Sequence, residues 1–194
     1  MEVKAKEVLL LLTDHWADWE AAYVIPGVNS VPQYTVKTIA TDKEAKMSMG
    51  GIKVETDYII DNYHDFDNLA MLILSGGSGW QERQHDEIAV FVKKVIDSQI
   101  PVAAICGATI FLGKHGFLDK VKHTGDDLEF FQKEQGYNGQ DFYVPAQVAV
   151  DNDIITANET AAVEFAHTIF GVLKLYSDEE IDGWYDYFKH GMVK

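Results

Sequence analysis

Pro101–Gly107 reads P-V-A-A-I-C-G and contains Cys106, the only cysteine of the chain. A short apolar run ends there on a nucleophilic side chain, and a helical pattern, Ala108–Lys114, follows at once. Strand, nucleophile and helix in direct succession are typical of a nucleophile elbow, which lifts the side chain above the C-terminal edge of a sheet. The turn also leaves the backbone N–H of Gly107 free to donate to an oxyanion. A buried structural cysteine is the alternative, since free cysteines are among the most buried residues.

The predicted position of Cys106 has a consequence for its ionisation. A thiol near a helix N-terminus experiences the partial positive charge of the helix dipole, and this favours the thiolate. We therefore expect a reactive thiol whose apparent pKa lies well below the reference value of about 8.5.

Apolar runs and helical patterns alternate along the rest of the chain. The patterns predict strands at Val8–Thr13, Tyr34–Ala40, within Asn68–Gly79, at Val102–Ile105, and at Val148–Val150 and Ile154–Ala157 around the turn D-N-D. They predict helices at Asp18–Asn29, His85–Ser98, Asp126–Gln135 and Thr160–Tyr176, a last helix capped by Ser177, and a hairpin excursion within Met47–Tyr58. Strands that alternate with helices predict an α/β fold, a doubly wound parallel sheet with helices on both faces.

Size and charge limit the classes of partner. The 194 residues fit a single domain, 1–194, and the net charge of −15 repels nucleic acid and anionic membranes. Arg83 is the only arginine, which makes a multiply phosphorylated substrate a poor candidate. One cysteine cannot form an internal disulfide, and the N-terminal apolar run is too short to span a membrane and has no cleavage site after it. We expect a cytoplasmic protein that acts on a small molecule.

Three predicted strands end on unusual residues: T-D-H-W-A-D-W-E at 13–20, S-G-G-S-G-W at 75–80 and I-C-G-A at 105–108. Because the carboxyl ends of parallel strands meet at one edge of a sheet, we expect a single site there, which His15 faces. Trp80 either walls this pocket or fills the core. The histidines and the cysteine lack metal-ligand spacing, and the glycine loop does not begin a dinucleotide fingerprint, so no metal or cofactor is expected.

These segments, together with G-F-L-D-K-V-K-H-T-G at 116–125 and D-N-D-I-I-T-A-N-E-T-A-A-V-E-F-A at 151–166, resemble the ThiJ/PfpI superfamily, relatives of the class I glutamine amidotransferases. The match is best to a bacterial branch labelled glutamine amidotransferase or intracellular protease/amidase. The resemblance covers nearly the whole chain and implies a flavodoxin-like, class I glutamine amidotransferase-like fold. It implies that Cys106 is the nucleophile, that the Glu20 carboxyl lies close to the thiol, that Gly77 and Gly107 supply oxyanion-binding N–H groups, and that His123 lies near the pocket.

The chain departs from the family pattern at one important position. Protease-like members have a histidine directly after the cysteine, whereas this chain has Gly107. His123 either replaces that histidine from a distance or is a satisfied structural residue. Ser75 stands where the glycine loop of the family has proline, which changes little because the donor in that loop is a glycine N–H.

Two functions of different kinds follow. The first is a cysteine-dependent hydrolase or glutamine amidotransferase-like protein acting on an amide or a carbonyl-bearing small molecule, with Glu20 or His123 moving protons. The second is a non-enzymatic stress-response or redox-sensing protein, in which Cys106 is oxidised to a sulfinate. A full glutamine amidotransferase normally needs a synthetase partner or domain to take the ammonia, and we expect no room for such a domain in 194 residues. The cluster W-Y-D-Y-F at 184–188 packs either on the body or on a partner subunit, which leaves a homodimer open.

Overall fold

The computed structural model describes residues 4–82 and 85–191, so Arg83 lies outside the described residues. Its centre is a seven-stranded sheet. From edge to edge the strands are β5 (Tyr58–Ile59), β2 (Tyr34–Ala40), β1 (Lys6–Leu11), β6 (Leu69–Leu74), β7 (Val102–Ile105), β9 (Ile154–Ala157) and β8 (Val148–Asp151). Every neighbouring pair is parallel except β8 and β9, which form an antiparallel hairpin at one edge. The predicted doubly wound α/β sheet is confirmed.

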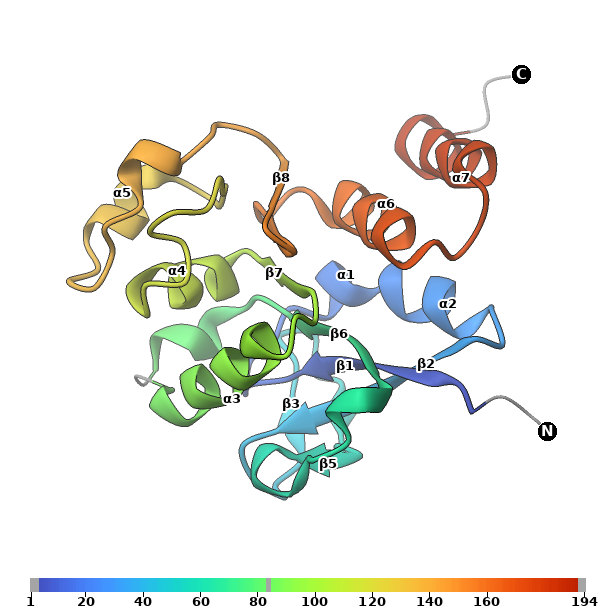
Figure 1. Cartoon of the computed structure of the whole chain (residues 1–194), viewed down its shortest axis with the longest axis horizontal. Coiled ribbons are helices and arrows are strands. Elements are labelled where there is room, and N and C mark those ends of the chain that lie inside the picture. Colours follow the sequence, from blue (N-terminus) through green and yellow to red (C-terminus); the bar gives the residue numbers. More distant parts are fainter. Residues whose placement is uncertain (1–3, 83–84, 192–194) are drawn as a thin grey trace.

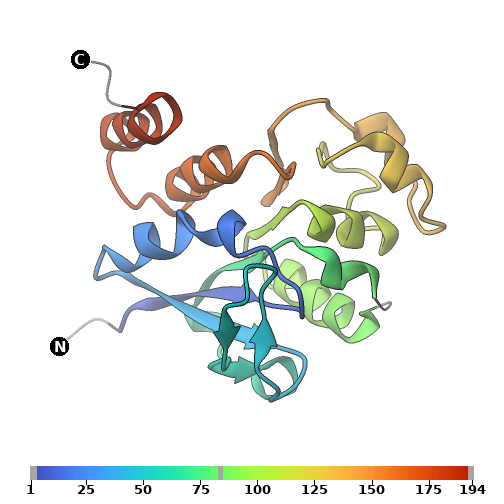
Figure 2. The same ribbon diagram turned by 180° about the vertical axis from the view of Figure 1, so that it is seen from behind.

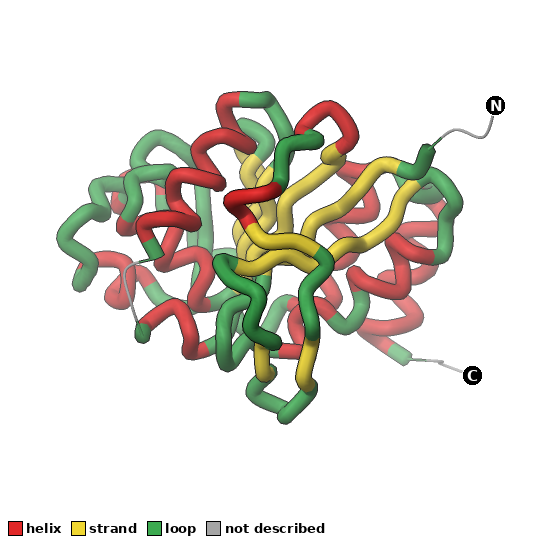
Figure 3. The backbone as a smooth tube through the Cα atoms, turned by 90° about the horizontal axis from the view of Figure 1, so that it is seen from below, coloured by secondary structure: helices red, strands yellow, loops and turns green. Residues whose placement is uncertain are grey.

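Helices cover both faces of this sheet (Figure 1), and Figure 3 shows the strands between the two helical layers. One layer holds α1 (Asp18–Ala21), α2 (Val24–Asn29), α6 (Ala162–Leu173) and α7 (Asp178–His190). The other layer holds α3 (Asp86–Asp97), α4 (Gly107–Lys114) and α5 (Leu128–Gln132). Because both faces are covered, the central strands are apolar on both sides. In β1, Leu9 and Leu11 join the core under α3 and α4, while Val8 and Leu10 join the core under α6.

The first predicted helix, Asp18–Asn29, is two helices in the structure. The first ends at Ala21 and the second begins at Val24. Pro26 explains the break, because proline has no N–H to donate and is tolerated only in the first turn, where N–H groups have no helical partner. A continuous helix from Asp18 would place Pro26 in its interior. The predicted helix Asp126–Gln135 is likewise shorter, since α5 begins after the cap at Asp127.

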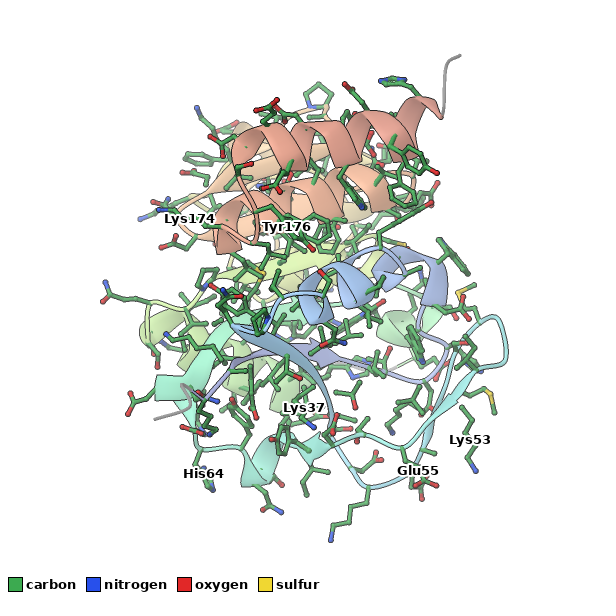
Figure 4. The ribbon with its side chains drawn as sticks, turned by 90° about the vertical axis from the view of Figure 1, so that its right-hand side faces the viewer. Lys37, Lys53, Glu55, His64, Lys174 and Tyr176 are labelled. Carbon is green, nitrogen blue, oxygen red and sulfur yellow. The ribbon has the colours of Figure 1, made fainter. Side chains whose placement is uncertain are left out.

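The predicted hairpin excursion is present. It consists of β3 (Lys46–Met47) and β4 (Lys53–Val54), which pair antiparallel. The hairpin stands out from the main sheet (Figure 2), and Figure 4 shows Lys53 and Glu55 pointing outward from this segment. The backbone of this excursion also reaches the predicted site, because Met49 donates its N–H to the Trp16 carbonyl at 2.9 Å.

The last helix, α7, packs against α6 after a turn that carries Lys174 and Tyr176 (Figure 4). The ring of Trp184 lies edge-on to Phe170 at 4.9 Å and to Tyr23 at 5.9 Å between centroids. The aromatic cluster therefore packs on the body, although Phe188 stays 44% exposed. No helix in the described part of the chain is long and apolar enough to cross a membrane.

The start of α7 allows a direct test of the fold. Ser177 and Glu180 form the predicted capping box, in which each side chain accepts a hydrogen bond from the backbone N–H of the other. Replacing Ser177 with alanine removes one of these acceptors and should lower the free energy of unfolding by about 1 kcal/mol. Urea denaturation measures this change, and an unchanged transition midpoint would contradict the cap.

Candidate functional site

Cys106 occupies a nucleophile elbow between β7 and α4. Its backbone angles, φ 55° and ψ −131°, are uncommon for a residue with a side chain. The N–H of Cys106 donates to the Ala157 carbonyl at 3.0 Å, and its own carbonyl accepts from the Thr109 N–H and hydroxyl at 2.9 and 2.7 Å. Hydrogen bonds to both the N–H and the carbonyl of Cys106 thus stabilise its strained conformation. Such strain persists at functional sites only where the surrounding structure holds it in this way.

The glycine loop after β6 brings the other strand ends to Cys106. The strands β1, β6 and β7 are neighbours, so their carboxyl ends meet at one edge. Gly76 lies between Glu20 and Cys106, and a Cβ there would collide with Glu20 Oε2 and lie 2.6 Å from the Cys106 Cβ. Only glycine lets the backbone pass between the carboxyl and the thiol.

Two backbone donors face the sulfur. The N–H groups of Gly77 and Gly107 lie within hydrogen-bonding reach of Cys106 and favour its thiolate form. Gly77 has φ +119°, and a Cβ there would collide with the His15 carbonyl oxygen. The structure therefore places both predicted N–H donors beside the nucleophile. When the sulfur bonds to a carbonyl carbon, the same N–H groups can donate to the oxyanion on that carbon.

Glu20 lies at the first turn of the α1 helix and is fully buried. Its Oε2 accepts the Gly76 N–H at 2.8 Å. Its Oε1 is buried and has no partner of normal hydrogen-bond geometry among the described residues. Burial raises the pKa of the Glu20 carboxyl to about 7, and the neighbouring Cys106 thiol offsets part of this rise. The carboxyl and the thiol are together, as the resemblance implied.

The expected low pKa of the thiol is wrong. Burial raises the pKa of Cys106 far above its ordinary value, and the charges of Glu20 and Asp126 raise it further. The donors Gly77 and Gly107 lower the pKa but do not compensate. The helix dipole acts over one turn only, whereas the burial of the thiol, the buried Glu20 carboxyl and the half-buried Asp126 carboxyl oppose the thiolate directly.

The buried carboxyl of Glu20 should make folding stability depend on pH. Its pKa rises from 4.5 in the unfolded chain to about 7 in the folded protein, so the folded state binds the proton more tightly. The resulting stabilisation, about 3 kcal/mol, is fully present below pH 4.5 and is lost as the pH rises through 7. Urea unfolding at pH 4.5 and at pH 8 measures it. The Glu20→Gln variant should lack this part of the pH dependence, and equal pH dependence in both proteins would contradict the assignment.

Two site residues were missed by the sequence analysis. Asp126, from the loop before α5, and Glu159, from the loop after β9, each place a carboxyl oxygen near the Cys106 sulfur, and all three atoms lie within 4.8 Å of one another. Burial raises the pKa of Asp126. The available signal was that Ile154–Ala157 ends at the same sheet edge as β7, with Glu159 two residues later. The set has one sulfur, two carboxyls and no histidine, unlike the zinc sites typical of proteins, so we assign no metal to it.

Neither predicted site histidine reaches the thiol. His123 is fully buried, and its two ring nitrogens bond the Val121 carbonyl at 2.7 Å and the Tyr137 hydroxyl at 2.8 Å. The proposal that it moves protons at Cys106 is therefore corrected: its ring is held in an aromatic cluster and is a satisfied structural residue. His15 is not among the residues that line the cleft; its ring instead contacts the carboxyl of Glu82, which does line it, at 2.7 Å.

A cleft of about 690 Å³ opens above the elbow. Glu20, Cys106, Asp126 and Glu159 form its polar end. Its other walls include Trp19, Met49, Trp80, Ile110, Phe111, Lys114, Phe130 and Lys133. Trp80 serves both of the predicted purposes, since it lines the cleft yet is 3% exposed and donates its Nε1–H to the Ser75 carbonyl at 2.8 Å. The volume suits a small molecule or a short peptide segment.

This chain is similar to known proteins over most of its length, including the residues of the site. A family model described as the DJ-1/PfpI family matches residues 6–171. Two proteins of Bacillus subtilis named as uncharacterized proteases are similar: YdeA is 33% identical over 91% of this chain and 88% of its own length, and YoaZ 29% identical over 94% and 90%. A DJ-1 superfamily protein of Agrobacterium tumefaciens has a TM-score of 0.88 and 28% identity, covering 96% of this chain and all of its own. A ThiJ/PfpI family protein of Bacillus anthracis has a TM-score of 0.90 and 29% identity, with coverages of 99% and 94%.

Proposed function

Because this chain belongs to the DJ-1/PfpI family, we propose that it is a cysteine-dependent hydrolase of small amides or other activated carbonyl compounds. Cys106 is the nucleophile and Glu20 moves the protons. The observation that carries the proposal is the buried Glu20 carboxyl, with a pKa of about 7, beside an elbow thiol that faces two backbone N–H donors. The names of the two Bacillus subtilis relatives support hydrolysis as the reaction class.

The first half of the reaction forms an acyl-enzyme. The ionised Glu20 takes the thiol proton as the Cys106 sulfur attacks the carbonyl carbon, so the sulfur never has to exist as a free thiolate. The carbonyl oxygen becomes an oxyanion beside the N–H groups of Gly77 and Gly107. When the C–N bond breaks, the proton on Glu20 passes to the leaving nitrogen, and a thioester remains on Cys106.

The second half regenerates the thiol. A water molecule attacks the thioester carbon, and Glu20 takes one of its protons. The same N–H groups stabilise the second oxyanion. The C–S bond then breaks, the carboxylic acid leaves, and Glu20 returns its proton to the sulfur. A carboxyl with a pKa of about 7 suits both directions, because it holds and releases a proton with similar ease at neutral pH.

A redox function is the second candidate, and the two N–H donors at the sulfur are the observation that favours it. The donors at Gly77 and Gly107, with a protonated Glu20, offer hydrogen bonds to the oxygens of a Cys106 sulfinate. Peroxide attacks thiolates, however, and the raised pKa of this thiol leaves little thiolate at neutral pH. The site therefore supports hydrolysis better than oxidation sensing.

The test is turnover of a panel of amino-acid and acyl esters and anilides by the wild-type protein. Because the chain has one cysteine, pretreatment with iodoacetamide blocks Cys106 selectively and should abolish turnover. Turnover that survives complete alkylation would contradict the proposal. Absence of turnover, together with rapid conversion of Cys106 to the sulfinate by dilute peroxide, would favour the redox function instead.

A further inference from the structure

Two carboxyl groups stand beside the thiol and have no place in the reaction described above. Asp126 and Glu159 come from different loops, and one oxygen of each lies within 4.8 Å of the Cys106 sulfur and of the other. Asp126 Oδ1 accepts the Glu159 N–H at 2.8 Å, which ties the two loops together and fixes their spacing. The pair therefore forms a defined wall at the reacting end of the cleft.

This wall has no counter-ion within residues 4–82 and 85–191. The ion pairs of the described chain all lie elsewhere. The two lysines that line the cleft stand over aromatic rings, Lys114 over Phe111 at 5.9 Å and Lys133 over Phe130 at 5.1 Å. Asp126 is half-buried and Glu159 is exposed, and two negative charges side by side repel each other, so a cation on a ligand would stabilise the pair.

A second observation points to a ligand at the same place. The Oε1 of Glu20 is fully buried, belongs to a residue that lines the cleft with Cys106, and makes no hydrogen bond of normal geometry to a described residue, although the Cys106 thiol is its neighbour. Buried polar atoms in native proteins nearly always have a partner, so an unpartnered one at a cleft end marks a position that a bound group completes.

The distances fit an ammonium group next to the reacting carbonyl. In a near-attack arrangement the sulfur stands about 3 to 3.5 Å from the carbonyl carbon. A nitrogen on the adjacent carbon lies about 2.5 Å from the carbonyl carbon. That nitrogen and the carboxylate oxygens, which lie within 4.8 Å of the sulfur, then share one end of the cleft, so that a charge-assisted hydrogen bond of about 2.8 Å can form between them.

We propose that Asp126 and Glu159 bind an ammonium group on the carbon next to the attacked carbonyl. The preferred substrates are then α-amino acyl compounds with a free amino group, such as an amino-acid amide or the first residue of a short peptide. This inference rests on the proposed nucleophilic role of Cys106. An N-acylated substrate leaves both carboxylates unpaired and brings an acyl group against them, which is the source of the specificity.

The test compares two alkylating probes, an amino-acid chloromethyl ketone with a free amino group and its N-acetylated form. In both, the Cys106 sulfur forms a bond to the methylene carbon, chloride leaves, and the thiol proton passes to Glu20 or to solvent. We expect the free amino form to label Cys106 at least 10-fold faster. The Glu159→Gln and Asp126→Asn variants should bring this ratio close to one, because each keeps the shape but removes a charge. Glu129→Gln is the matched control and should keep the wild-type ratio, because Glu129 is an exposed residue of α5 that does not line the cleft.

The possible results either support or overturn the proposed ammonium subsite at Asp126 and Glu159. Equal or faster labelling by the acetylated probe, or an unchanged ratio in Glu159→Gln, overturns the subsite. If micromolar Zn²⁺ protects Cys106 and the two probes react at the same rate, the carboxyl pair binds a metal ion instead. This result also overturns the ammonium subsite. A 10-fold ratio in a protein that hydrolyses no ester or anilide supports the subsite while contradicting the proposed hydrolysis. Failure of both probes to label Cys106 contradicts the two together.

Discussion

The Glu20→Gln variant should lose hydrolytic activity by about 10²- to 10⁴-fold in kcat/KM, the usual contribution of a positioned general base. The physical reason is that glutamine can accept the Gly76 N–H as Glu20 does but cannot take the thiol proton. The same substitution should make the thiol easier to ionise, because the charge of Glu20 is one cause of the raised pKa of Cys106. Alkylation by iodoacetamide at neutral pH should therefore become faster while catalysis becomes slower.

Those opposite changes indicate a catalytic carboxyl provided that the site stays packed. A loosened site would also expose the thiol and lower its pKa, because burial is the first cause of the raised value. Urea denaturation at neutral pH controls for this, and the Glu20→Gln protein should unfold no earlier than the wild type. The pH profile of alkylation for the wild type and Glu20→Gln measures the second effect, and Glu129→Gln again serves as the control for charge removal. Unchanged turnover in Glu20→Gln, or a thiol pKa that rises, would show that Glu20 does not move the proton.

The Gly77→Ala variant should lower kcat by about 10²- to 10³-fold, the effect of losing one oxyanion donor. Gly77 combines φ +119° with ψ 174°, a conformation that is essentially restricted to glycine. An added methyl group would also collide with the His15 carbonyl oxygen, so the loop must shift and carry its N–H away from Cys106.

A matched glycine lies far from the site. Gly171 lies in α6, and a Cβ there would meet no atom within 4 Å. Gly171→Ala should therefore keep full activity and gain slightly in stability, since alanine favours a helix over glycine. Equal activity of the Gly77→Ala protein and the wild type would exclude an oxyanion role for this N–H.

The strands and loops that form the site could be predicted from the sequence, because they depend on local sequence patterns. The apolar run before Cys106, the helical pattern after it and the glycine loop at 75–80 predicted which strand ends meet, and the structure has them as neighbours. The strand Tyr34–Ala40 has its predicted bounds, because β-branched residues alternate there and polar residues limit both ends. Pro26 was visible in the sequence, but its effect on the first helix depends on where that helix begins.

The electrostatics of the site were not predictable from local patterns. The thiol pKa depends on burial and on two carboxyls that are distant along the chain: Asp126, in a loop 20 residues away, and Glu20, in α1 86 residues away. Likewise, nothing local to His123 shows that the Tyr137 hydroxyl and the Val121 carbonyl occupy both of its ring nitrogens. Loop positions such as Glu159 are set by tertiary packing, which periodicity does not report.

The central claim is that Cys106 forms a covalent acyl intermediate, and intact-protein mass spectrometry tests it most directly. The protein is mixed with an activated amino-acid ester and quenched in acid within one turnover. The account predicts a mass increase of one acyl group, located on the peptide that contains Cys106 and absent from the Cys106→Ser variant treated in the same way. Hydrolysis that proceeds with no adduct at Cys106, and at an equal rate in Cys106→Ser, would contradict it.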